Sequence, residues 1–241
     1  MKTLHKNKRL HLFFIHILLL SGFSVYSQQD TTVLKEETTT KIDSLYREDQ
    51  FFFSFTYNTL QNKPSRMAQN KFSTGFSVGV LRDMPINKER TIAFASGLGL
   101  TYNNYIQNLS IQGSSQKALY AILEEQYQTN KISQLFIDLP IEFRWRNSTY
   151  QSHKFWRVYG GVKGSYLLYD RTVFDGDSGK SIIKGNKDFN KLLYGVYVAA
   201  GYNTINLYAY YGLNPLFASA KIEDKNIQLK ALNVGLIFYI L

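Results

Sequence analysis

Charged side chains are concentrated in one alternating stretch, residues 134–146. Asp138, Glu142, Arg144 and Arg146 occupy even-numbered positions, and nearly every odd-numbered position carries a large apolar residue. Side chains alternate between the two faces of a β-strand, so this stretch has one apolar face and one strongly charged face. The charged face must look either at bulk water or into an enclosed interior, and the rest of the chain decides between these two environments.

Two basic residues of the following candidate strand, Arg157 and Lys163, complete the charged set. Because an unpaired buried charge is very costly, we expect Asp138 and Glu142 to pair with Arg157, Lys163 or Arg144. The predicted role of this network is structural: the paired charged side chains occupy the enclosed interior that the strands surround. The alternative is a gate or a relay for protons and ions, in which neutralising Glu142 or Arg157 would change conductance.

The sequence contains few residues that could form a catalytic site. Enzymes that modify lipids occur on eight-stranded barrels, the fold predicted below for this chain. Their chemistry usually needs a histidine base beside a nucleophile and a carboxylate. Only His153 lies beyond the predicted N-terminal signal, in a predicted turn next to Ser152 and Lys154. With no cysteine and no second histidine, a metal site also lacks ligands. The sequence predicts no enzymatic activity and no cofactor.

Two glycine-containing motifs favour structural roles. Residues 175–179, Asp-Gly-Asp-Ser-Gly, match part of a calcium-binding loop but lack its acidic ligand at position twelve. A loop tip explains them better. Gly97 and Gly99 lie inside a candidate strand with no helix to receive a phosphate, so no nucleotide-binding motif is predicted.

Eight segments share this two-faced alternation, with large apolar residues on one face and polar or small residues on the other. Such a pattern, in an even number of strands, is typical of a transmembrane β-barrel. An eight-stranded barrel has an interior that side chains fill, and small residues would make room for the larger charged groups. The predicted strands are 51–58, 72–81, 92–102, 134–146, 156–168, 192–202, 205–213 and 232–240.

The connections between these segments alternate between long and short. Transmembrane barrels have short periplasmic turns and longer extracellular loops. The sequence therefore predicts an all-β, eight-stranded antiparallel up-and-down transmembrane barrel with both termini in the periplasm. The long connections are 61–70, 103–133, 170–189 and 214–225, and the short ones are 83–90, 147–153 and 203–204.

The N-terminus has the features of a secretory signal peptide. Residues 1–27 contain a basic start, a short apolar run and small residues before the expected cleavage site. Residues 28–50 are polar and predict a flexible periplasmic tether, and residues 51–241 form the predicted barrel domain. Without the four basic residues of the signal, 24 basic and 18 acidic residues remain, a net charge of +6. This mild excess does not predict nucleic-acid binding.

The last predicted strand resembles the sorting signal that the barrel assembly machinery recognises in outer-membrane proteins. That signal places a polar residue, a glycine, an aromatic residue and an apolar residue at fixed spacing. Asn233, Gly235, Phe238 and Ile240 match it, although the chain ends one residue later, at Leu241. We therefore expect the barrel assembly machinery to be a partner during biogenesis.

The longest connection, residues 103–133, contains apolar residues at helical spacing. Leu119, Ile122 and Leu123 surround Glu124 and Glu125, so residues 116–126 predict a short helix on the barrel rim. The alternative is an element that binds a partner or caps a ligand, because long loops on rigid scaffolds often carry function.

The chain after the tether resembles the PorT-like outer-membrane β-barrel family of Bacteroidota. The resemblance is carried by residues 46–51 (YREDQF), 81–86 (LRDMPI), 139–144 (LPIEFR) and 210–215 (YYGLNP). It implies an outer-membrane location in a Bacteroidota-like, Gram-negative bacterium and a link to type IX protein secretion.

These observations predict a non-enzymatic envelope protein with a structural or accessory role, which presents its extracellular loops, and the family resemblance implies a link to secretion. The expected partners are outer-membrane lipid and lipopolysaccharide, the barrel assembly machinery and, as the resemblance implies, a secretion-system protein, with no nucleic acid. The alternative function is a small selective channel or transporter that uses a charged lumen.

Overall fold

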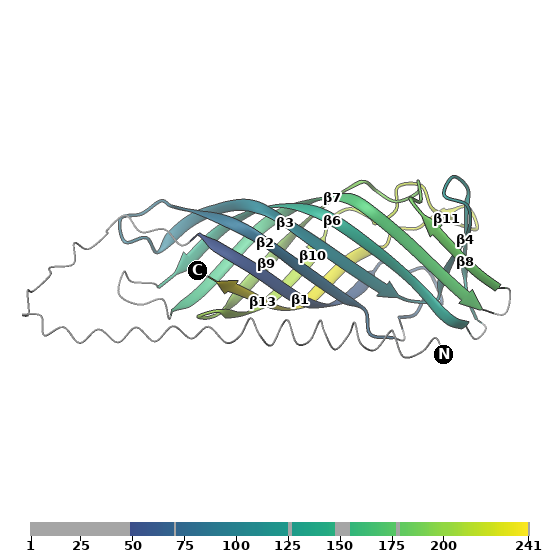
Figure 1. Ribbon diagram of the computed structural model, residues 1–241, viewed down its shortest axis with the longest axis horizontal. Coiled ribbons are helices and arrows are strands. Elements are labelled where there is room, and N and C mark those ends of the chain that lie inside the picture. The colour runs from purple at the N-terminus through teal and green to yellow at the C-terminus, as the bar shows by residue number, and fades with distance from the viewer. Residues whose placement is uncertain (1–48, 70, 125–126, 148–154, 177–178, 241) are drawn as a thin grey trace, which may run out of the picture. The chain divides into compact units, whose positions relative to one another are not determined.

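The computed structural model describes residues 49–69, 71–124, 127–147, 155–176 and 179–240. Within them, eight long antiparallel strands form a closed barrel, because each pairs with the next along the chain and the last pairs with the first (Figure 1). This confirms the predicted eight-stranded up-and-down architecture. The strands are β1 (Gln50–Gln61), β2 (Thr74–Pro85), β3 (Ile92–Ile106), β6 (Tyr127–Arg146), β7 (Trp156–Gly176), β9 (Leu192–Tyr202), β10 (Ile205–Gly212) and β13 (Lys230–Ile240).

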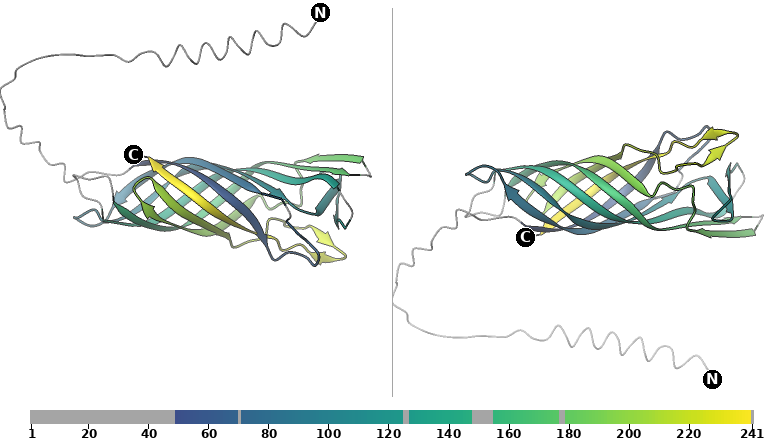
Figure 2. Two further views of the ribbon diagram at one scale, coloured as in Figure 1. Left: turned by 90° about the horizontal axis from the view of Figure 1, so that it is seen from below. Right: turned by 90° about the horizontal axis from the view of Figure 1, so that it is seen from above.

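The barrel closes along the seam between its first and last strands. β1 and β13 pair continuously, from Phe51 opposite Ile240 to Gln61 opposite Lys230. Closure leaves the barrel wall without a free edge, so its backbone polar groups are satisfied between strands, as a non-aqueous surrounding requires. Figure 2 shows the strands running diagonally around the barrel, as closure of a sheet requires.

The outer face of the barrel is apolar around its circumference. In β1 the exposed fraction is 64% for Phe51 but 7% for the neighbouring Phe52. Leu139 of β6 and Val162 of β7 are likewise exposed, whereas the adjacent charged residues Asp138 and Lys163 are buried. A continuous apolar belt of this size matches a lipid surrounding rather than bulk water. No helix in the described ranges is long and apolar enough to cross a membrane.

The two ends of the barrel differ in the length of their connections. The loop end carries the long connections, 62–73, 107–126, 177–191 and 213–229. The turn end carries the short connections, 86–91, 147–155 and 203–204, and the ends of the barrel at Gln50 and Ile240. In the shortest turn, Asn203 adopts a left-handed φ of 56°, a conformation in which asparagine is enriched. The predicted alternation of connection lengths is therefore present.

The long connections contain more regular structure than the sequence predicted. β6 begins seven residues before the predicted position 134, and β7 continues eight residues beyond 168. β8 (Gly179–Lys184) pairs with this extension of β7. Two hairpins complete the loop end, β4 (Leu109–Gly113) with β5 (Ala118–Ile122), and β11 (Lys221–Ile222) with β12 (Lys225–Asn226).

The predicted helix at residues 116–126 is wrong. Its described part forms β5, which pairs with β4. Leu119 points to solvent with 64% exposure, whereas its neighbours Ala118 and Tyr120 pack against the buried core. The period of two set by cross-strand pairing therefore overrides the helical spacing of Leu119 and Ile122.

Several predictions fall outside the described residues. They are the signal peptide at 1–27, nearly all of the tether at 28–50, and the turn that contains His153. These remain predictions from sequence.

Candidate functional site in the barrel interior

The charged residues singled out from the sequence all face the barrel interior. Asp138, Glu142, Arg144 and Arg146 of β6 are at most 2% exposed, as is Arg157 of β7. Lys163 of β7 is 9% exposed. The interior is thus both charged and shielded from solvent, and the ion pairs divide into two clusters.

The first cluster lies near the turn end and is organised by Asp83, the first residue of the predicted short connection 83–90. The Asp83 carboxylate accepts hydrogen bonds from Arg146 Nη1 and Nη2, both at 2.8 Å, and from Arg144 Nη1 at 2.9 Å. Arg144 Nε also donates to Glu142 at 2.8 Å, and the Tyr239 hydroxyl donates to Glu142 at 3.1 Å. This geometry gives strong charge-assisted bonds, bidentate in the Arg146 pair.

Small residues on β3 allow this contact to cross a strand. Asp83 of β2 is paired with Ala95, and Ala95 is paired with Glu142 of β6. Ala93 is likewise paired with Arg144, and both alanines are completely buried. Because alanine leaves space above β3, the long arginine side chains reach from β6 to the carboxylate on β2.

The sequence contained a signal for Asp83. The alternation of β2 continues past the predicted end at Leu81, with Leu81 buried, Arg82 exposed, Asp83 buried and Met84 exposed. This period, continued through Pro85, predicts an inward Asp83. The predicted turn at 83–90 is therefore wrong for residues 83–85, which belong to β2.

The second cluster lies midway along the barrel. Lys163 Nζ is 3.2 Å from Asp138 Oδ2, and Ser165 donates to Asp138 Oδ1 at 2.6 Å. The Thr101 hydroxyl also donates to Asp138. Lys163 lies 4.6 Å from the ring centroid of Tyr210, in cation–π geometry. Both charges are therefore paired, and Asp138 has three donors.

Arg157 has a different environment from the carboxylate pairing expected for it. Its guanidinium lies 4.5 Å from the ring centroid of Phe155 and 5.7 Å from those of Tyr159 and Tyr239. Within the described ranges it forms no ion pair, and its Nε and Nη1 atoms have no hydrogen-bond acceptor. Asp83 and Glu142 already pair with Arg144 and Arg146, and Arg157 is held by aromatic faces rather than by a carboxylate.

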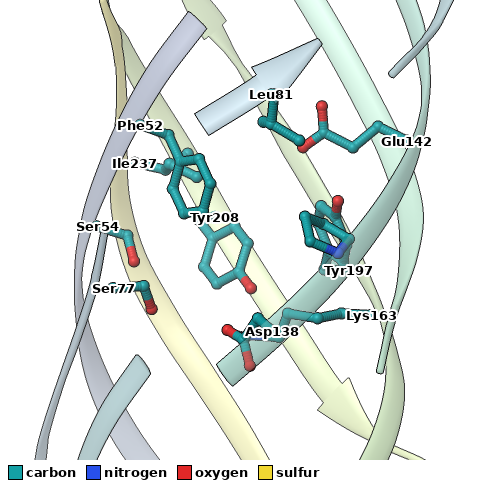
Figure 3. Close-up of a pocket in the computed structure, with 11 residues that line it drawn as sticks. Phe52, Ser54, Ser77, Leu81, Asp138, Glu142, Lys163, Tyr197, Tyr208 and Ile237 are labelled. Atoms are coloured by element: carbon teal, nitrogen blue, oxygen red, sulfur yellow. The ribbon is translucent and has the colours of Figure 1, made fainter. Parts of the chain in front are cut away.

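The barrel interior contains a small cavity beside its charged residues. One interior cavity has a volume of about 20 Å³ and is bordered by Asp138, Glu142 and Lys163 (Figure 3). That volume is enough for about one water molecule. Phe52 fills the space beside two glycines of the wall, since a Cβ on Gly79 or Gly99 would come within 3.0 Å of its ring. The interior is packed, not open.

The loop end is closed by packed connections. Phe189 stacks on Phe217 with 4.7 Å between ring centroids, and Tyr120 of β5 meets Phe217 edge-on at 5.5 Å. The Tyr120 hydroxyl donates to Asp188 at 2.8 Å and accepts from Asn186 at 2.9 Å. Burial raises the pKa of the Tyr120 phenol above its ordinary value. These contacts join three of the long connections into one cap, hereafter the loop cap.

A groove lies on the outer surface of the loop end. It has a volume of about 520 Å³ and is bordered by residues 62–66, by β5 and by the β11–β12 hairpin. Ile122, Ile222 and Ile227 give it apolar walls, while Lys63 and Lys225 line it as cations. This concave, mixed surface is large enough for a ligand or a peptide segment.

The structure offers little for metal binding. In the parts of the chain that it describes, no group of three or more histidine, aspartate or glutamate side chains converges on one point. Asp175, from the motif that matches part of a calcium loop, is 3.3 Å from Lys180 across the β7–β8 pair.

The residues of the proposed sorting signal lie on both faces of β13. Asn233 is buried, and a Cβ on Gly235 would come 2.1 Å from the carbonyl oxygen of Phe55. Phe238 stacks on Phe53 with 4.7 Å between centroids, and Ile240 is exposed. Recognition by the assembly machinery stays a prediction.

A closed antiparallel barrel with an apolar belt outside and paired charges inside defines an integral β-barrel protein of the outer membrane. The sequence matches the outer membrane protein beta-barrel domain family over residues 26–218, and the chain belongs to this family. The family places the protein in the outer membrane of a Gram-negative bacterium.

Among solved structures, the chain is similar to Ail, the attachment invasion locus protein of Yersinia pestis. The two are 10% identical, and the match covers 80% of this chain and 99% of Ail, with a TM-score of 0.39. No curated protein matches the chain in sequence.

Proposed function

We propose that this protein is a non-conducting, non-enzymatic component of the outer membrane, with a structural or accessory role, that presents an ordered loop end to partners. Both chain termini then lie in the periplasm and the loop end faces the exterior. The sequence resemblance to PorT-like barrels supports one specific accessory role, a link to type IX secretion.

The packed interior is the observation that carries the proposal. Ion pairs occupy the barrel interior, the cavity beside Asp138 and Glu142 holds about one water molecule, and the loop cap covers the loop end. A selective channel needs a continuous wet path, and no such path follows from these contacts. Catalysis would need a nucleophile with a positioned base, whereas the interior carboxylates Asp83, Asp138 and Glu142 are already held in ion pairs with arginine or lysine.

Planar-bilayer conductance tests the closed interior. The refolded protein should give no discrete conductance steps, under conditions in which a general porin gives them. Glu142→Gln and Arg157→Gln should be equally silent. Reproducible steps for the wild type that change in size or ion selectivity in Glu142→Gln would replace this proposal with the channel.

Partner binding is tested by affinity purification from outer membranes through a tag on the N-terminal tether. The variant Lys63→Glu/Lys225→Glu reverses two charges of the groove, and Lys117→Glu/Lys221→Glu is its matched control at positions outside the groove lining. A partner that binds the groove should be lost from the first variant and retained by the second. Recovery of type IX secretion components would support the secretion link, and their consistent absence would leave the structural role alone.

A further inference from the structure

Two cations face each other directly on the outer surface near the loop end. Arg171 of β7 is the cross-strand partner of Lys184 of β8. The intervening neighbours Asp170, Thr172 and Ile183 are buried, so Arg171 and Lys184 share the outward face. Like charges directly opposite each other destabilise a strand pair, so this arrangement needs a compensating anion.

A third cation lies on the same face. Ser133 of β6 pairs with Arg171, and Lys131 is the next outward residue of β6. Lys131 and Arg171 are half-buried and Lys184 is exposed, so the stems of the first two lie along the sheet while their charged ends remain accessible. We call these three residues the basic triad.

No carboxylate of the described chain neutralises the basic triad. Lys131, Arg171 and Lys184 make no ion pair within the parts of the chain that the structure describes. The same two strands do pair opposite charges elsewhere, since Asp175 is opposite Lys180 and their charged atoms are 3.3 Å apart. The missing anion is therefore a local property of the basic triad.

The position of the triad relative to the apolar belt indicates where the anion comes from. Leu168 and Tyr169 of β7 are 52% and 42% exposed, and Arg171 follows two residues closer to the loop end. Two residues of a strand span about 7 Å, so Arg171 lies just beyond Tyr169, and the exposed Ile182 of β8 flanks Lys184 on the loop-end side. The cations therefore lie at the loop-end margin of the apolar belt, where a bound lipid would place its headgroup.

We propose that the basic triad binds the phosphate groups of a phosphorylated glycolipid, the lipid A of the outer leaflet. A phosphate placed between Arg171 and Lys184 accepts hydrogen bonds from both and removes their repulsion. Lys131 reaches a second phosphate or the same one from β6. The acyl chains of the lipid then lie against Leu135, Leu168 and Tyr169. The assignment to the outer leaflet rests on the proposed outward orientation of the loop end.

Lipid A titration of the purified full-length mature protein in detergent micelles tests this site, with bound lipid counted by native mass spectrometry. Binding in micelles does not depend on the orientation of the protein in a membrane. A lack of lipid A binding would therefore contradict the lipid site without bearing on the proposed topology. The test variant is Lys131→Gln/Arg171→Gln/Lys184→Gln. The matched control, Lys88→Gln/Lys117→Gln/Lys221→Gln, loses the same charge from the first short turn, the segment between β4 and β5, and the β11–β12 hairpin.

The triad variant should bind bisphosphorylated lipid A about tenfold or more weakly than the wild type, since each cation near a lipid surface contributes on the order of a fivefold change. The control should bind like the wild type, and dephosphorylated lipid A should bind wild type and triad variant alike. Arg171→Lys, which keeps the charge, should retain most of the affinity, and it provides a readout if the triple variant fails to fold.

Three results would overturn the proposal. They are unchanged lipid A binding by the folded triad variant, an equal loss in the control, or full displacement of lipid A by millimolar inorganic phosphate. The last result would show a site for a free anion instead of a lipid.

Discussion

Arg144 and Arg157 are both buried in the barrel interior, yet their surroundings differ. Arg144 bridges Asp83 and Glu142, whereas Arg157 packs against Phe155 and other aromatic faces. A buried charge that is hydrogen-bonded to carboxylates is costly to remove, because its partners lose their compensation. A buried charge without a carboxylate partner is itself a source of instability.

Methionine substitutions should therefore separate the two arginines. Arg144→Met should lower the free energy of unfolding by about 3–5 kcal/mol, because it leaves Asp83 and Glu142 less compensated. Arg157→Met keeps a long side chain against the aromatic rings and should be within about 1 kcal/mol of the wild type, or more stable. Reversible urea unfolding in lipid vesicles measures both. A loss in Arg157→Met as large as that in Arg144→Met would mean that Arg157 has a charge-dependent role.

At the scale of elements, the β4–β5 hairpin is part of the closure of the barrel. Leu109 and Ile111 of β4 are buried in the main core cluster, and Tyr120 of β5 joins Asp188 and Phe217. The hairpin is thus a packed component of the loop cap, in place of the helix that the local spacing predicted.

A single substitution in β5 should open the loop cap without unfolding the barrel. Tyr120→Ala should increase protease cleavage in the loop-end connections several-fold, because it removes one aromatic contact and two hydrogen bonds. Heat-modifiable gel mobility should stay unchanged, since the barrel strands keep their pairing. Leu119→Ala, on the solvent side of the same strand, is the matched control and should behave like the wild type. Loss of heat modifiability in Tyr120→Ala would instead show that the cap is needed for the barrel to fold.

The loop cap should also respond to strongly alkaline pH. Because burial raises the pKa of Tyr120, the folded cap disfavours the ionised phenol. The stability that the neutral Tyr120 phenol contributes is fully present below the unfolded-state pKa of about 10. It is lost as the pH rises through the higher folded-state pKa. Protease resistance of the loop end should therefore fall above about pH 10 in the wild type. Tyr120→Phe should show a smaller decrease over the same range.

At the scale of the whole molecule, the alternation of short and long connections predicts the orientation in the membrane. The chain has no cysteine, so single cysteines introduced at each end report accessibility without a background. Lys117→Cys, between β4 and β5, should react with a membrane-impermeant maleimide in intact cells. Lys88→Cys, in the first short turn, should react only after the outer membrane is permeabilised. The reverse pattern would place the loop end in the periplasm.

The sequence by itself determined the number of barrel strands, the inward and outward faces and the order of connections. It did so because the side-chain period of two is local, and because a lipid surrounding demands an apolar residue at nearly every outward position. The inward direction of Asp138, Glu142 and Lys163 followed from the same period.

Only the tertiary structure decided which charges meet and how the ends are closed. Strand register across the small residues of β3 brings Asp83 to Arg144 and Arg146, and no local pattern encodes that register. Strand register also places Arg157 against aromatic rings rather than beside a carboxylate. Residues 116–126 show helical spacing, yet pairing of β5 with β4 overrides that preference, since tertiary contacts outweigh weak local propensity.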